Sequence, residues 1–234
     1  MFFAPDFLQE GMDYEMKRVL CYGDSNTYGY DPNTQGRYPK DVRWPGVLAG
    51  LLGEEYEVIE EGLNNRTTAL EPEGEPWRSG AYYLEPCLRS HIPVDLFVLM
   101  LGSNDMKTVF CQTAESVGTH VRQLIREIRR VSAEKNPWGQ SCEILLISPI
   151  FVSERIIEVD DSNEFGGMAA VNLSRQLPSV YERIAGEEGC IYLNGASCAD
   201  PSREDGLHLD EDGHRKLAEA LAQVIKNIYS DIQR

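Results

Sequence analysis

The sequence predicts an α/β protein, a three-layer α/β/α sandwich with a central five-stranded parallel sheet. Short and almost continuously apolar runs, such as LFVLML and ILLIS, are typical of strands that are covered on both faces. Longer segments between them repeat apolar residues at helical spacing. This alternation favours parallel strands joined by right-handed helical crossovers. With 234 residues and 42% hydrophobic content, the chain can build such a core.

The five strands are predicted from apolar runs that are rich in β-branched residues. They cover residues 18–22, 56–60, 95–101, 143–148 and 190–193.

Two long helices are predicted from their apolar stripes. In residues 115–135 the stripe contains Val117, Val121, Leu124, Ile125 and Ile128, and towards the end of the chain it contains Leu217, Leu221, Val224, Ile225 and Ile228. Residues 62–93 and 149–168 are long for simple connectors, so they are predicted as loops that build or cover a pocket at the carboxyl edge of the sheet.

Residues 17–234 are predicted to form a single domain, because no repeat or Pro/Ser-rich linker divides them. Residues 1–16 are predicted to be an N-terminal extension. They lack the basic and apolar regions of a secretory signal, and no run approaches the roughly 20 apolar residues of a membrane span. We therefore expect a cytoplasmic protein with no membrane partner.

The charge and the cysteines narrow the class of partner. A formal net charge of -16 repels polyanions, so we expect no nucleic acid partner. The six cysteines form no Cys-x-x-Cys pair and no zinc-spaced cluster, which predicts free thiols, no metal and a reducing compartment.

Four polar motifs stand where strands are predicted to end or where the last helix begins. They are Gly-Asp-Ser-Asn at 23–26, Glu-Gly-Leu-Asn-Asn-Arg at 61–66, Gly-Ser-Asn-Asp at 102–105 and Asp-Gly-Leu-His at 205–208. Parallel strands bring the first three to one edge of the sheet, and the fourth can return there. Together they supply what acyl transfer needs: a serine hydroxyl, an imidazole to take its proton, a carboxylate to orient the imidazole, and N–H donors for an oxyanion.

These four motifs, in this order, resemble the four blocks of the SGNH hydrolases, also called the GDSL esterase/lipase family, over about residues 17–231. The stretches DVRWPGVLAGLLG, EVIEEGLNNRTT and LMLGSNDMK are similar to its bacterial arylesterase, acetyl-sugar esterase and perhydrolase branch. The resemblance implies a flavodoxin-like fold, a small ester substrate, no cofactor and a homo-oligomer.

Carried onto this chain, the resemblance implies Ser25 as nucleophile, His208 as general base and acid, and Asp205 as its orienting partner. The backbone N–H groups of Ser25 and Gly62 and the side chain of Asn104 would form the oxyanion hole.

Further residues have open roles. Trp44 lies in an Arg-Trp-x-Gly motif that the resemblance places by the acyl pocket, although it can equally be a core residue. Asn65 and Asp24 are candidate substrate contacts, while Asp24 and Asp105 are also interpreted as acceptors that fix their loops. Asn26 departs from the family, since many members have an apolar residue there. His214 is predicted to lie on the surface.

The predicted function is hydrolysis of short-chain acyl esters, chiefly acetyl esters, of carbohydrates or aryl alcohols through an acyl-Ser25 intermediate. Acyl transfer to another acceptor, including peroxide, or thioester hydrolysis at the same site stays open. So does a non-catalytic module in which the first loop binds an anion, as in flavodoxin-like folds.

Overall fold

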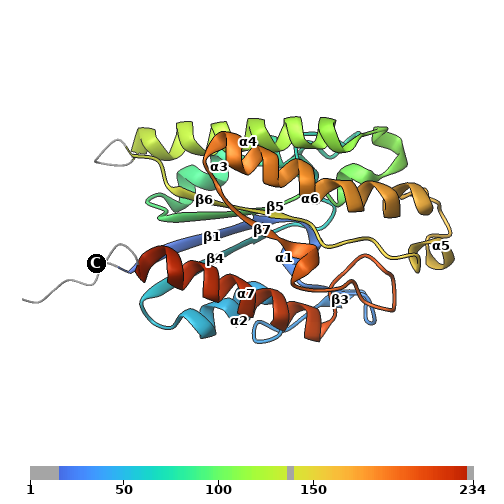
Figure 1. The fold of residues 1–234 in the computed structure, drawn as a ribbon, viewed down its shortest axis with the longest axis horizontal. Helices are drawn as coiled ribbons and strands as arrows, with labels where there is room; N and C mark the ends of the chain where they lie inside the picture. Colours follow the sequence, from blue (N-terminus) through green and yellow to red (C-terminus); the bar gives the residue numbers. More distant parts are fainter. Residues whose placement is uncertain (1–15, 136–139, 231–234) are drawn as a thin grey trace, which may run out of the picture.

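A five-stranded parallel sheet forms the centre of the computed structural model, which describes residues 16–135 and 140–230 (Figure 1). Its strands lie in the order β4-β1-β5-β6-β7. They span β1 (Lys17–Gly23), β4 (Tyr56–Gly62), β5 (Leu96–Met100), β6 (Glu143–Ser148) and β7 (Ile191–Asn194). Each predicted strand is present, with bounds within two residues of those expected.

Helices cover both faces of the sheet, and the strands feed two separate cores. On one face lie α3 (Gly80–His91), α4 (Ala114–Lys135) and α6 (Met168–Glu188), and on the other lie α2 (Trp44–Leu52) and α7 (Glu211–Ser230) (Figure 1). Side chains alternate along β1, so that Leu20 and Tyr22 pack on the first face and Val19 and Cys21 on the second. This double burial explains why the strand sequences are apolar without alternation.

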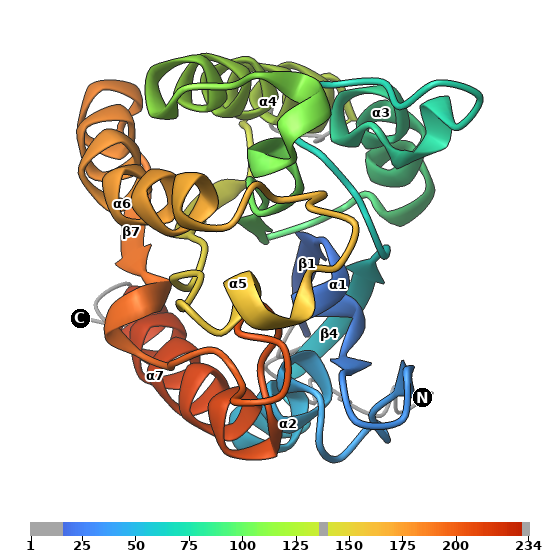
Figure 2. The ribbon, with the colours of Figure 1, turned by 90° about the vertical axis from the view of Figure 1, so that its right-hand side faces the viewer.

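Short elements gather at the carboxyl ends of the strands, the edge that faces the viewer in Figure 2. The helices α1 (Ser25–Tyr28) and α5 (Ile156–Val159) lie in front of the sheet there. The remaining elements are β2 (Tyr30–Asp31), β3 (Gly36–Arg37), and the 3-10 helices η1 (Pro76–Arg78), η2 (Asn104–Met106), η3 (Thr108–Phe110) and η4 (Gly195–Ser197). Among the described residues, no helix combines the length and the apolar character needed to cross a membrane.

The structure corrects the prediction that residues 62–93 form a loop throughout, because α3 occupies the second half of this stretch. Ser79 caps α3 by accepting a hydrogen bond from the N–H of Tyr82, and the helix contains Pro86. Its buried residues Leu84 and Leu88 are one turn apart. The predicted extension, residues 1–16, lies outside the described residues except for Met16.

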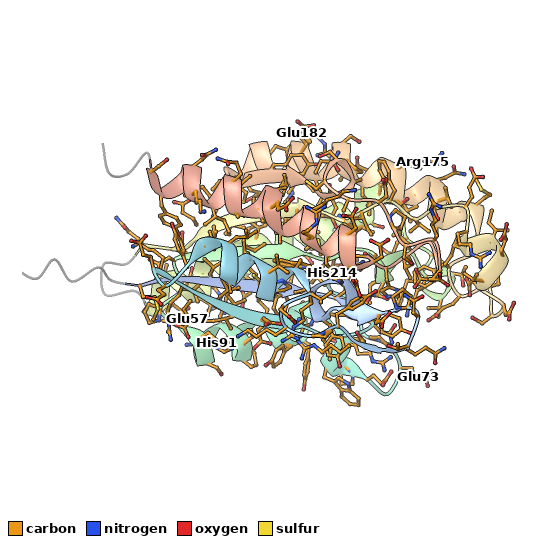
Figure 3. The ribbon with its side chains drawn as sticks, turned by 90° about the horizontal axis from the view of Figure 1, so that it is seen from below. Glu57, Glu73, His91, Arg175, Glu182 and His214 are labelled. Carbon is orange, nitrogen blue, oxygen red and sulfur yellow. The ribbon has the colours of Figure 1, made fainter. Side chains whose placement is uncertain are left out.

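His214 is not a surface residue. Its side chain is fully buried on α7. In Figure 3 it is labelled near the middle of the molecule, whereas Arg175 and Glu182 of α6 lie at the edge of the view. Its Nδ1 accepts a hydrogen bond of 3.2 Å from the backbone N–H of Trp44, the first residue of α2, and its ring meets Tyr38 edge-on at 5.3 Å. The preceding residue, Arg43, makes no side-chain capping hydrogen bond. His214, on another helix, therefore provides the acceptor for the first N–H group of α2.

Candidate active site

A tight turn at the end of β1 brings Ser25 to the carboxyl edge of the sheet. At Gly23, a Cβ atom would lie 2.0 Å from Oγ1 of Thr27 and 2.7 Å from the carbonyl oxygen of Met100. Only glycine therefore allows α1 to begin so close to the neighbouring strand, and Ser25 is the first residue of that helix.

Asp24 holds this turn as the N-cap of α1. Its Oδ1 accepts a hydrogen bond of 3.0 Å from the N–H of Asn26. Burial raises the pKa of the Asp24 carboxyl, and hydrogen bonds from Asn26 and Ser103 oppose that rise. The side chain is almost fully buried and works as a loop-fixing acceptor.

The loop before α7 places an imidazole and a carboxylate beside Ser25. Nε2 of His208 lies 2.8 Å from Oγ of Ser25, and Nδ1 lies 2.5 Å from Oδ2 of Asp205. Oδ1 of Asp205 accepts three further hydrogen bonds, from the N–H groups of Leu207 (2.9 Å) and His208 (3.0 Å) and the hydroxyl of Ser202 (3.0 Å).

The electrostatics of this pair fix the direction of proton transfer. Burial raises the pKa of Asp205, but the hydrogen bonds and the charge of His208 outweigh it, so the pKa falls to about 2. Asp205 is consequently a carboxylate at neutral pH, and Nδ1 of neutral His208 must donate to it. Nε2 is then the acceptor that faces the Ser25 hydroxyl.

A cavity of about 210 Å³ opens directly onto these side chains. The ring of Tyr30 packs on the His208 ring, with centroids 4.5 Å apart. The cavity is small, partly polar and bounded by the strand-end loops; its lining residues are Ser25, Tyr30, Asn64, Asn65, Asn104, Glu164, Phe165, Leu207 and His208.

Hydrogen-bond donors also reach this cavity. Asn104 lines it and donates one Nδ2 hydrogen to the carbonyl oxygen of Arg66 at 3.1 Å, which leaves the second hydrogen for a ligand. Asn65 lines it too, with a left-handed backbone at φ 63°. Within residues 16–135 and 140–230, the N–H groups of Ser25 and Asn65 have no intramolecular acceptor.

Gly62 is not placed as the sequence suggested. It is absent from the cavity lining, and a Cβ atom there would lie 2.1 Å from the backbone nitrogen of Tyr28. Its glycine character is explained by close packing of β4 against α1. Three residues further on, Asn65 holds the position in the cavity that was expected for Gly62.

The order and geometry of these motifs agree with the comparisons. The model of the GDSL-like lipase/acylhydrolase family matches residues 21–216. The chain belongs to this family.

Solved structures of two proteins named as esterases share the fold at substantial identity. An aryl esterase of M. smegmatis is 34% identical with a TM-score of 0.83, and the match covers 90% of this chain and 99% of that one. A carbohydrate acetylesterase family member from Sinorhizobium meliloti is 37% identical with a TM-score of 0.82, over 90% of this chain and 98% of that one. The predictions of the family and of the α/β/α fold are confirmed.

A curated relative is longer than this chain. The acetylxylan esterase of Xylanibacter ruminicola is 25% identical over 225 residues, which make up 89% of this chain and 43% of that protein. The chain thus spans less than half the length of this relative.

Trp44 stands apart from the GDSL-type site. Its side chain is fully buried in the core between the sheet and the helices α2 and α7, and it is not among the residues that line the cavity. The core alternative therefore describes Trp44, and of the three candidate substrate contacts only Asn65 lies at the cavity.

The sequence did not predict the individual residues of one side of the cavity, where Glu164 and Phe165 line it and Lys107 contacts them. Nζ of Lys107 donates to Oδ1 of Asn65 at 2.9 Å and pairs with the Glu164 carboxylate at 2.8 Å, while Phe165 lies beneath the same ammonium group at 5.6 Å. Glu164 and Phe165 belong to the segment 149–168 that was expected to cover a pocket. Lys107 lies two residues after the third motif, and this closeness to Asn104 in the sequence was the available signal.

One group of possible metal ligands occurs among the described residues, away from Ser25. Ligand atoms of Glu61, Cys87 and His91 lie within 4.8 Å of one another. Nε2 of His91 already bonds to Oε1 of Glu61 at 2.8 Å, and the positive charge of Arg66 acts on the Cys87 thiol, so a cation would meet an existing pair and a like charge. All six cysteines are free thiols.

Proposed function

We propose that this chain hydrolyses short-chain acyl esters, chiefly acetyl esters, of carbohydrates or aryl alcohols through an acyl-Ser25 intermediate. The observation that carries the proposal is the unbroken chain of contacts from Ser25 through His208 to Asp205 at the mouth of a small cavity. Relatives named as an acetylxylan esterase, a carbohydrate acetylesterase and an aryl esterase support this substrate class.

In this mechanism His208 moves one proton twice. Nε2 accepts the proton of the Ser25 hydroxyl while Oγ attacks the acyl carbonyl carbon, and Asp205 stabilises the imidazolium. As the tetrahedral intermediate collapses, the C–O bond to the alcohol breaks and His208 donates the proton to the leaving oxygen. A water molecule then attacks the acyl-enzyme by the same steps and releases the acid.

The developing oxyanion would be stabilised by the N–H groups of Ser25 and Asn65 and by Nδ2 of Asn104. All three residues line the cavity, and the two backbone N–H groups are unpaired within the described part of the chain. Such donors act strongly because they are oriented before charge develops. This proposal replaces Gly62 by Asn65.

The cavity supports a small acyl group and a polar alcohol. Its volume of about 210 Å³ is below the roughly 300–1,000 Å³ of sites that hold drug-sized ligands. The side chains of Asn64, Asn65 and Glu164 can hydrogen-bond to the hydroxyl groups of a sugar.

Hydrolysis of p-nitrophenyl acetate by the wild type and Ser25→Ala tests the function. We expect loss of about a thousandfold or more in kcat for Ser25→Ala. Ser197→Ala is the matched control, since Ser197 is an exposed residue of η4 that bonds only to its own turn and Cys198. Equal activity of Ser25→Ala and wild type would exclude the proposed mechanism.

We also propose that copies of the chain associate and that the protein is cytoplasmic. Three exposed apolar side chains support association: Val109, Ile157 and Met168, which lie on segments that contact one another near Gly166 and Gly167. The six free cysteines support a reducing compartment. A sedimentation profile at the monomer mass of 26.4 kDa would contradict association.

A further inference from the structure

Asn26, the residue after the proposed nucleophile, reaches across to the loop that carries His208. Its side chain is 3% exposed. Oδ1 accepts a hydrogen bond of 2.8 Å from the N–H of Leu209, and Nδ2 donates to the carbonyl oxygen of Leu207 at 3.4 Å. The carboxamide thus bonds to the backbone on both sides of His208, about 180 residues away along the chain.

The two bonds require a carboxamide. Leu209 presents a donor and Leu207 presents an acceptor, and a carboxamide offers the opposite group to each. A leucine at this position would offer neither, and a carboxylate would satisfy Leu209 but not Leu207. Many family members have an apolar residue at this position, whereas in this chain Asn26 has two specific partners, the backbone groups of Leu207 and Leu209.

The His208 loop has few side-chain connections to α1. Asp205, Ser202 and His208 bond to one another within the loop, which orients the imidazole relative to its own segment. Apart from the two bonds of Asn26, one side-chain hydrogen bond joins α1 to this loop among the described residues, that between Ser25 and His208. That bond belongs to the reaction itself.

This last bond is lost in the middle of the proposed reaction. When Ser25 carries an acyl group, Oγ is an ester oxygen with no hydrogen, so it can no longer donate to Nε2 of His208. Deacylation still requires Nε2 within hydrogen-bond reach of the attacking water. The Asn26 bonds involve no reacting atom and persist through both halves of the reaction.

We propose that Asn26 is a positioning residue that holds His208 over the active site in the acyl-enzyme, so that its loss slows deacylation more than acylation. This inference rests on the proposed function. Displacement of a catalytic group by about 1 Å can cost about 100-fold in rate, so we expect Asn26→Leu to lower the deacylation rate by about 10-fold to 100-fold.

Pre-steady-state hydrolysis of p-nitrophenyl acetate separates the two steps. The concentration of reactive serine is measured by fluorophosphonate titration of a separate sample. The burst of p-nitrophenol and the steady rate of untreated enzyme are then divided by this concentration. For Asn26→Leu we expect a near-stoichiometric burst, a slow steady rate, and accumulation of acetylated protein in the mass spectrum. A merely destabilised protein would lose burst and steady rate together, with their ratio unchanged.

Two more variants keep the test decisive. Asn26→Asp has nearly the same volume, retains the acceptor for Leu209 and removes only the donor to Leu207, so it should show a smaller fall in deacylation. Asn194→Leu is the matched control, because Oδ1 of Asn194 also accepts from a backbone N–H, that of Ala196 at 3.1 Å, without touching the His208 loop.

The outcomes are distinct for the two levels of the proposal. Wild-type ratios of burst to steady rate in both Asn26→Leu and Asn26→Asp would refute the positioning role, as would an equal change in Asn194→Leu. Loss of the proposed function itself would instead appear as equal activity of wild type and Ser25→Ala.

Discussion

Replacing Asp205 by asparagine provides a sharp test of the proton path, because the hydrogen bonds around this residue dictate how the amide must sit. Three donors converge on Oδ1 and one, Nδ1 of His208, meets Oδ2. The single oxygen of asparagine therefore takes the place of Oδ1, and its NH₂ group faces Nδ1 of His208.

This arrangement reverses the tautomer of the base. Two donors would meet unless the proton of His208 moves from Nδ1 to Nε2, and with Nε2–H the ring cannot accept the proton of Ser25. We expect kcat for p-nitrophenyl acetate to fall by about 10⁴-fold, which corresponds to about 5 kcal/mol in activation free energy. The three retained bonds to the amide oxygen should keep the thermal unfolding temperature close to that of the wild type.

Asp210→Asn is the matched control for this experiment. Asp210 lies two residues beyond His208, and its Oδ1 accepts from the N–H of Gly213 at 2.8 Å without contacting the imidazole. It should retain wild-type kcat. The reasoning would be refuted by Asp205→Asn activity within tenfold of the wild type, or by an equal loss in Asp210→Asn.

Three further predictions concern the oxyanion donors, the packing of α1 and a buried titration. Asn104→Ala should lower kcat by about 100-fold to 1000-fold, and it should also lower the free energy of unfolding by about 1–3 kcal/mol because the carbonyl oxygen of Arg66 loses its hydrogen bond. A smaller loss of kcat in steady-state assays would remove Asn104 from the oxyanion hole. Gly62→Ala forces a Cβ atom into the backbone of α1, so it should lower the activity and reduce the free energy of unfolding by about 1–3 kcal/mol in a urea titration. Gly50→Ala is the control and should be tolerated, because a Cβ atom there would have nothing within 4 Å. Burial lowers the pKa of His214 to about 3, so the unfolded chain binds this proton at a higher pH than the folded protein does. The free energy of unfolding should therefore fall as the pH drops from about 6.5 towards 3, by up to about 1.4 kcal/mol per pH unit. His214→Asn keeps an acceptor for the N–H of Trp44 and should lose this slope between pH 6.5 and 4.5, and an unchanged slope would contradict the assignment.

Much of the fold was predictable because the strands carry an unmistakable signal. Burial on both faces makes each strand a short apolar run, and the long helices α4 and α7 show one apolar stripe each. Helix α3 escaped prediction because Pro86 and a polar, aromatic surface interrupt its stripe, and tertiary packing through Leu84 and Leu88 decides its conformation instead.

The residues of the site were predictable where chemistry demands a particular side chain. Ser25, Asp205 and His208 could be recognised by type and order, and the structure brings them into hydrogen-bond contact. The choice between Gly62 and Asn65 depends on a backbone N–H, which every residue except proline carries, so only the left-handed conformation at Asn65 and the packing of Gly62 distinguish them.

His214 shows how a usable signal can be overlooked. It precedes Leu217 by three residues and Leu221 by seven, which places it on the buried stripe of α7, yet a histidine is readily interpreted as a surface residue. Its partner, the N–H of Trp44, comes from a distant helix and has no counterpart in local sequence.

The position of α7 has a consequence for incomplete chains. Both the base and the helix that covers one face of β1 and β5 lie in the last part of the sequence, after residue 204. A polypeptide that stops at β6 would contain the serine turn but no imidazole to activate it, and Val19, Cys21 and Val98 would have lost the packing of Leu217 and Leu221. The proposed esterase activity therefore depends on the segment after residue 204, and a chain truncated at β6 is expected to be both inert and prone to associate through its uncovered sheet face.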